Sequence, residues 1–248
     1  MKILSNLANL TRMRKSLIIT LLLTFPGLIQ IVAQQPSITE YLAECERKYG
    51  SDMDLVNGEK YFNPYRNAMG NPFFFEEPRK AVITIHEKEF DDQMLRYDIY
   101  DQKLVLDYTD LYGASSSLVL RNEWVESFSF DNLRFVKMEG PDGTSEYFQT
   151  VNDGPVSCVY RWSKNYQLNL TSGVQSYYFT EPVKEAYLVI GGHFHPFRNN
   201  SSFTKAFDQE SQKLIKQFMR QSRIKVKRAP DSQIRHLVEY CNSLSNEN

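Results

Sequence analysis

The residues best suited to chemistry are two histidines, His193 and His195, which are separated by one residue. On a strand, both imidazoles would point to the same face and could share a metal ion such as zinc. A catalytic zinc needs a third protein ligand, for which Glu185, Asp208 and Cys158 are the candidates. The alternative is that both histidines are ordinary polar positions of a hairpin that turns at the two glycines before His193.

Other catalytic patterns are weaker. The run from His86 to Phe90 begins like the helix of a zinc protease, but Phe90 stands where the second histidine belongs. A turn between two strands is the better interpretation of that run. Cys158 lies in an alternating run, where a cysteine is usually a small core residue and not a nucleophile. Two carboxylates could form the acid and base of a glycosidase, although no spacing selects a pair. The acidic candidates are Glu76-Glu77, Asp91-Asp92, Asp98, Asp101, Asp107 and Asp110.

Motifs of well-understood enzymes are missing from the sequence. It contains no Gly-x-Ser-x-Gly elbow, P-loop, Rossmann glycine pattern, Cys-x-x-Cys pair or EF-hand loop. The sequence therefore favours a protein without catalytic activity and implies no cofactor.

The charge of the chain is unevenly distributed. Its 248 residues include 29 basic and 30 acidic ones, yet residues 213–228 carry seven basic residues and no acidic one. We call this stretch the basic segment, and its cations are Lys213, Lys216, Arg220, Arg223, Lys225, Lys227 and Arg228. Such a patch attracts an anionic membrane by about 1 kcal/mol per basic residue. We expect an anionic envelope surface or a protein partner, and no nucleic acid. The alternative is a solvated helix face packed against an acidic body.

Residues 1–33 have the layout of a secretory signal peptide, with a basic start, an apolar stretch from Leu17 to Leu23 and a small residue, Ala33, suited to cleavage. The whole apolar segment, from Leu17 to Ala33, is broken at Pro26-Gly27 and is shorter than the roughly 20 residues of a membrane span. We therefore expect a periplasmic or secreted protein, with no transmembrane segment after signal removal, and a single β-rich domain over residues 34–248.

Export changes how the cysteines are interpreted, because thiols in an oxidising compartment tend to pair. Cys45 and Cys241 each lie on the apolar face of an expected helix. A disulfide between them would close a loop of roughly 200 residues and stabilise the fold by about 4–5 kcal/mol. Two buried thiols are the alternative.

The elements that position these residues are mostly strands. Helical spacing predicts a short helix from Ser37 to Gly50, and alternating runs rich in Val, Ile, Tyr and Phe then continue to Phe197. The fold class is mainly β (α+β): an antiparallel β-sandwich or partly open β-barrel with a short N-terminal helix and two C-terminal helices. Expected strands are Val82–Ile85, Leu95–Tyr100, Leu104–Tyr108, Ser117–Leu120, Val125–Phe130, Arg134–Met138, Glu146–Thr150, Val156–Trp162, Ser176–Thr180, Ala186–Ile190 and His193–Phe197.

Local signals also predict a hairpin register and the C-terminal helices, in residues 201–246. Gly191-Gly192 fits a two-residue turn with positive φ at both positions, which places Ile190 opposite His193. Ser201 or Ser202 is expected to cap a helix whose apolar stripe includes Phe203, Phe207, Leu214, Ile215 and Phe218. Asp231 or Ser232 then caps a last helix with the stripe Ile234, Leu237, Val238, Cys241 and Leu244.

Several segments together suggest a family resemblance: Asn57–Tyr61, Gly70–Phe74, Leu95–Tyr100, Val125–Phe130 and the helix starting near Phe203. With these segments the chain resembles a family of uncharacterised exported proteins from the Bacteroidota. The resemblance spans about residues 55–244 and rests on turn glycines, aromatic strand residues and a basic terminal helix. It implies a location in a Gram-negative envelope and brings no catalytic residues.

Three functional hypotheses follow. The first is a non-catalytic envelope protein that binds a partner or a ligand, such as a lipid or another apolar molecule in a cavity of the sheet. The second is an envelope hydrolase with a metal at His193 and His195 or an acid pair. The third is a structural accessory of an envelope assembly that docks through the basic segment.

Overall fold

The computed structural model describes residues 52, 54–56, 58–109, 113–170 and 176–245. The chain divides into two units, residues 1–45 and 46–248, and the fold below is that of the second unit. The expected signal peptide, the expected helix from Ser37 to Gly50 and Cys45 lie outside the described residues.

Strands dominate the described part of the chain, and helices follow them. The strands are β1 (Gly58–Lys60), β2 (Ala68–Met69), β3 (Arg79–Ile85), β4 (Lys88–Asp98), β5 (Lys103–Thr109), β6 (Ser115–Leu120), β7 (Val125–Phe130), β8 (Leu133–Glu139), β9 (Ser145–Thr150), β10 (Val156–Ser163), β11 (Tyr166–Asn169), β12 (Ser176–Phe179), β13 (Val183–Ile190) and β14 (His193–Phe197). The helices are α3 (Asn200–Thr204), α4 (Gln209–Gln221) and α5 (Asp231–Ser245).

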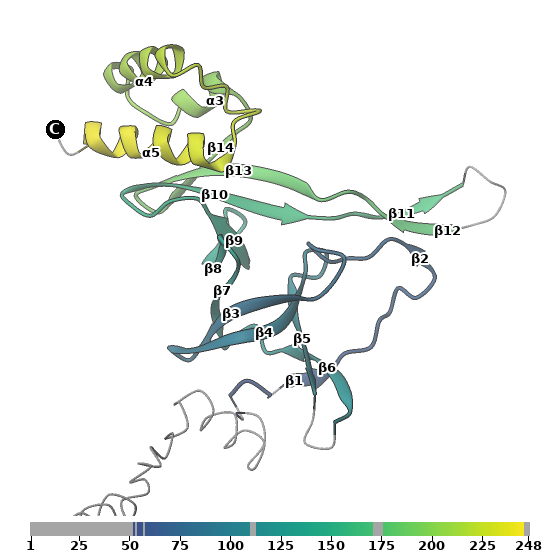
Figure 1. Ribbon diagram of the computed structural model, residues 1–248. Helices are drawn as coiled ribbons and strands as arrows, with labels where there is room; N and C mark the ends of the chain where they lie inside the picture. Colours follow the sequence, from purple (N-terminus) through teal and green to yellow (C-terminus); the bar gives the residue numbers. More distant parts are fainter. Residues whose placement is uncertain (1–51, 53, 57, 110–112, 171–175, 246–248) are drawn as a thin grey trace, which may run out of the picture. The chain divides into compact units, whose positions relative to one another are not determined.

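Eleven of these strands form one antiparallel sheet, in the order β1-β6-β5-β4-β3-β7-β8-β9-β10-β13-β14 (Figure 1). Within the described residues β1 and β14 are its two edges, so the sheet does not close into a barrel. A small second sheet has the order β11-β12-β2, in which β12 and β2 are parallel. The expected mainly β, antiparallel class is confirmed, and the sheet is open.

The first hydrophobic cluster lies among β3 to β9 and is dense in aromatic rings. Phe128 and Phe135 stack with ring centroids 4.8 Å apart, and the rings of Tyr97 and Tyr147 meet Phe128 edge to face. All four side chains are almost completely buried. This core is therefore filled by its own side chains, which contact one another.

The second cluster lies between the sheet and the three helices, which sit together beside β10, β13 and β14 in Figure 1. Leu188 on β13 and Leu237 on α5 are fully buried there. Polar side chains fix the helices to the sheet: the Asn242 amide donates to the carbonyl of Val156 and accepts from its N–H, at 2.9 and 2.7 Å. Burial of the apolar stripe of α5 thus positions the C-terminal part of the chain.

The turns follow the local signals closely. Gly191 and Gly192 have φ of 56° and 81°, as a two-residue turn of this type requires. His86 and Glu87, with φ of 49° and 63°, form the turn between β3 and β4. The run from His86 to Phe90 is therefore a hairpin, as expected, and not the helix of a zinc protease.

Two expectations about the first C-terminal helix were wrong: that it is a single helix, and that Leu214 is part of its buried stripe. The helix expected from Ser201 or Ser202 is two helices: Asn199 caps α3, and Asp208 caps α4 by accepting from the N–H groups of Glu210 and Ser211. The residues between them break the helix, since Asp208 satisfies the free N–H groups of a new first turn. On α4 the buried residues are Ile215 and Met219, whereas Leu214 is 40% exposed.

The strand boundaries also differ from expectation. β4 begins at Lys88, seven residues before the expected start at Leu95, because its first half is largely exposed and shows no hydrophobic alternation. Strands β1, β2 and β11 were not expected from the sequence. They are short and largely exposed, so they also lack hydrophobic alternation.

Candidate functional site

His193 and His195 lie on β14, in the expected register. Ile190 pairs with His193 and Leu188 with His195, so the two histidines share a face of the strand. No group of three His, Cys, Asp or Glu side chains that could hold a metal occurs within the described ranges. The structure therefore brings no third ligand to this pair, and the metal site remains a prediction.

The candidate third ligands have other partners or surroundings. Asp208 caps α4, and Glu185 accepts a hydrogen bond of 3.1 Å from the hydroxyl of Tyr187. Cys158 is fully buried on β10, and burial raises the pKa of its thiol to about 12. A thiol with such a pKa is almost wholly protonated at neutral pH, so Cys158 is unsuited to act as a nucleophile.

Two of the candidate carboxylates are held by neighbouring groups, and the acid pair remains a prediction. Asp107 is held by Arg96, whose Nε and Nη2 donate to its two oxygens at 2.9 and 2.6 Å. Asp98 accepts from the N–H groups of Tyr100 and Asp101 in the β4–β5 turn. Burial raises the pKa of Asp98 to about 6, against the opposing effect of these hydrogen bonds. Asp98 therefore has a structural role, and Asp110 lies outside the described residues.

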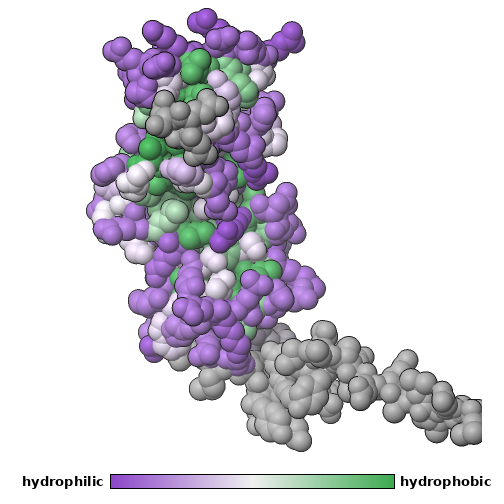
Figure 2. All heavy atoms as spheres, turned by 90° about the vertical axis from the view of Figure 1, so that its left-hand side faces the viewer, coloured by the Kyte–Doolittle hydropathy of each residue, from purple (hydrophilic) through white to green (hydrophobic). Residues whose placement is uncertain are grey.

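The basic segment forms a continuous exposed surface. All seven of its cations are exposed, whereas four of the apolar residues between them, Ile215, Met219, Ile224 and Val226, are buried in the second cluster. Charged groups cannot be buried cheaply without partners, so burial of the apolar side turns every cation outward. In Figure 2 the end of the molecule that carries the helices is predominantly hydrophilic.

The end of α4 fixes the path of this segment. Arg223 has φ of 54°, the left-handed conformation that usually falls to glycine after a helix. The N–H of Ile224 donates to the carbonyl of Met219 at 2.9 Å and so closes the helix end. An arginine at such a position carries backbone strain that a glycine avoids.

Asn200, at the start of α3, holds the next residues. Its Nδ2 donates to the carbonyl of Ile224, and its Oδ1 accepts from the N–H of Val226, both at 2.9 Å. Residues 224–226 are thereby bonded across to α3, which is distant in the sequence. The sequence carries no signal for this role, because its pattern there predicts only a helix cap at Ser201 or Ser202.

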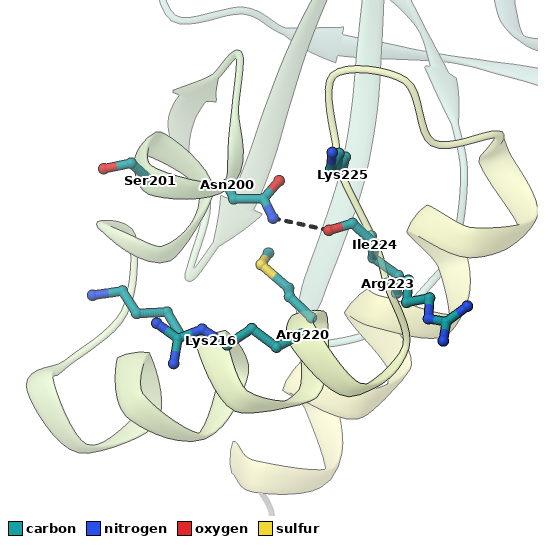
Figure 3. Close-up of a pocket in the computed structure, with 8 residues that line it drawn as sticks. Asn200, Ser201, Lys216, Arg220, Arg223, Ile224 and Lys225 are labelled. Atoms are coloured by element: carbon teal, nitrogen blue, oxygen red, sulfur yellow. Dashed lines mark hydrogen bonds between the residues drawn. The ribbon is translucent and has the colours of Figure 1, made fainter.

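A pocket of about 690 Å³ lies where α3, α4 and this segment meet, and we call it the α3–α4 pocket (Figure 3). The residues that line it are Asn200, Ser201, Lys216, Met219, Arg220, Arg223, Ile224 and Lys225. Four of the eight are cations and none is acidic. Figure 3 shows Lys216 and Arg220 extending from α4 to the side where Ser201 lies, whereas Arg223 extends to the opposite side.

Within the described residues, no carboxylate forms an ion pair with the cations around the pocket. The same holds for the other cations of the basic segment, since the ion pairs in the described part of the chain involve other residues such as Arg96 and Arg161. Lys216 and Arg220 are four residues apart on one helix face, a like-charge pair that costs about 0.2–0.5 kcal/mol. The negative end of the α4 dipole stabilises Arg220, but that effect does not extend beyond the last turn.

The basic surface continues past the pocket. Lys227 lines a second hollow, of about 460 Å³, together with two more cations, Lys184 and Arg198, and one acidic residue, Glu185. The Lys184 ammonium lies 4.1 Å from the centre of the Tyr160 ring. Cations from β13, from the residues after β14 and from the basic segment therefore share one region of the surface.

Cys241 lies in α5 and is buried, and its burial raises the pKa of the thiol to about 12. Because its expected partner Cys45 is outside the described residues, the disulfide remains a prediction.

Comparison of the chain with protein-family models, with curated proteins and with solved structures finds no match. The function must therefore be inferred from the geometry of the chain itself. Of the helices in the described ranges, none combines the length and the apolar composition that crossing a bilayer requires.

Proposed function

We propose that this protein is a non-catalytic protein of a bacterial envelope that binds an anionic membrane surface through the basic segment. The envelope location rests on the signal-like pattern of residues 1–33 and on the family resemblance. One observation carries the binding function: seven exposed cations lie on one ordered segment, and no carboxylate in the described residues forms an ion pair with them.

The packing supports this proposal. Ile224 and Val226 anchor the segment in the second cluster, and Asn200 bonds its backbone, so the surface needs little ordering when it binds. Each lysine or arginine near an anionic membrane contributes about 1 kcal/mol. Three such residues together account for about 3 kcal/mol, or roughly a hundredfold in affinity.

The test is sedimentation of the exported protein with vesicles of phosphatidylcholine, with and without phosphatidylglycerol. The variant carries Lys216→Ser, Arg220→Ser and Arg223→Ser. A matched control removes three exposed cations elsewhere, with Lys60→Ser, Lys80→Ser and Lys103→Ser. We expect the wild type to bind the anionic vesicles, the first variant to lose about a hundredfold in affinity, and the control to bind much as the wild type does.

Equal binding of the wild type to neutral and anionic vesicles would refute the proposal. Equal losses in the two triple variants would also refute it, because binding would then depend on net charge and not on the basic segment. Since binding through charges is screened by salt, affinity for the anionic vesicles should fall as the ionic strength rises.

A further inference from the structure

The α3–α4 pocket has features that a merely basic surface does not need. It combines four cations with the hydroxyl of Ser201 and has a floor formed by Met219 and Ile224, which are 2% and 3% exposed. The Ser201 hydroxyl forms no hydrogen bond within the described part of the chain, although the Ser201 carbonyl accepts from Thr204. This exposed hydroxyl can therefore donate to a ligand beside the cations of α4.

The donors on one side of the pocket suit a phosphate group. Arg220 offers a planar guanidinium that can donate two parallel hydrogen bonds, and Lys216 offers a compact ammonium. Both extend to the side where Ser201 lies (Figure 3). A terminal phosphate monoester presents three oxygens to such donors, whereas a phosphodiester presents two. The bound anion would also relieve the repulsion between Lys216 and Arg220.

The surroundings indicate that this phosphate belongs to a membrane. Lys213 and Lys227 are exposed and do not line the pocket, so a small ligand inside it would not reach them. Lys213 precedes Lys216 and Arg220 by three and seven residues, so the three cations share one face of α4. An anionic surface that continues beyond the pocket can engage Lys213 together with the pocket cations.

We propose that the α3–α4 pocket binds the terminal phosphate monoester of a lipid headgroup, through Lys216, Arg220 and Ser201. This inference rests on the proposed membrane function and names its preferred lipid class. Arg223 and Lys225 line the pocket elsewhere and strengthen the electrostatic attraction. Asn200 is a positioning residue, because both ends of its amide are already bonded to the backbone of the basic segment.

The test compares two sets of vesicles at equal zeta potential, one with phosphatidic acid, a phosphomonoester, and one with phosphatidylglycerol, a phosphodiester. We expect about tenfold tighter binding to phosphatidic acid, as one additional charge-assisted hydrogen bond would give. Lys216→Ser and Ser201→Ala should each reduce this preference. The control Lys213→Ser removes one charge from the same helix outside the pocket, and it should weaken binding to both lipids while leaving the preference intact.

The vesicle measurements separate this inference from the proposed function. Equal binding to the two lipids, with both bound better than phosphatidylcholine, would overturn this inference and leave the proposed function standing. No binding above phosphatidylcholine would overturn both. Loss of the preference in Lys213→Ser to the same extent as in Lys216→Ser would place the recognition outside the pocket. If soluble glycerol 3-phosphate competed fully at the concentration of accessible lipid phosphate, the ligand would be a free phosphate ester and the membrane source would be wrong.

Discussion

Arg223 provides the most direct link between the backbone and the proposed binding surface. It occupies a left-handed position, φ 54°, at the end of α4, where a residue with a side chain costs about 1–2 kcal/mol. Glycine relieves this strain, but its greater freedom in the unfolded chain offsets about 0.5–1 kcal/mol. We therefore expect Arg223→Gly to stabilise the backbone at this position by about 0.5–1 kcal/mol.

The charge of Arg223 must be separated from its backbone conformation. Arg223→Gln removes the charge and keeps a side chain at the strained position, so the difference between the Gly and Gln variants isolates the backbone contribution. Chemical denaturation in urea should place the midpoint of Arg223→Gly about 0.3 M above that of Arg223→Gln. In vesicle binding the two variants should be equal, each about fivefold weaker than the wild type, because each loses one cation.

Two results would refute this reasoning. A Gly variant no more stable than the Gln variant would contradict the left-handed helix end. Wild-type binding by either variant would show that the Arg223 charge does not act in the binding surface. Arg223→Gly is thus expected to stabilise the fold and, at the same time, to weaken binding to anionic vesicles.

Three further predictions concern other sites. Burial raises the pKa of the Asp98 carboxyl to about 6, so the native state binds the proton more tightly than the unfolded state does. The free energy of unfolding should therefore fall as the pH rises from about 4 to 6. Asp98→Asn keeps the acceptor oxygen for the β4–β5 turn, and it should raise the free energy of unfolding by about 2–3 kcal/mol at pH 7 and leave it unchanged at pH 4. Asn200→Ala should cost about 2 kcal/mol in thermal or urea unfolding, because it removes the partners of two backbone groups, and an unchanged stability would refute the bridging role. Because no third ligand joins His193 and His195 in the described residues, a chelator should leave the melting temperature unchanged in both the wild type and the double alanine variant; a drop in the wild type alone would establish the metal site.

Much of the sheet could be predicted because its signals are local. The register of His193 and His195 on β14 follows from the two glycines before them, and the burial of Cys158 follows from its place in an alternating run. Where a strand is exposed, as in the first half of β4, the hydrophobic alternation is lost. The sequence pattern therefore does not predict that part of the strand. The break between α3 and α4 was missed because helical spacing continues across it, and only the capping by Asp208 marks it.

The sequence by itself determined the composition of the proposed binding surface: seven cations, no acid among them, and apolar residues between them. Only the tertiary structure decided which of these cations lie around one pocket. Asn200 and Ser201 come from α3, and the hydrogen bonds from Asn200 to the residues after α4 bring that helix against the basic segment. Spacing along the chain cannot reveal this contact, because the second hydrophobic cluster brings the two elements together. Its buried members come from β10, β13, β14, all three helices and the residues that follow β9 and α4.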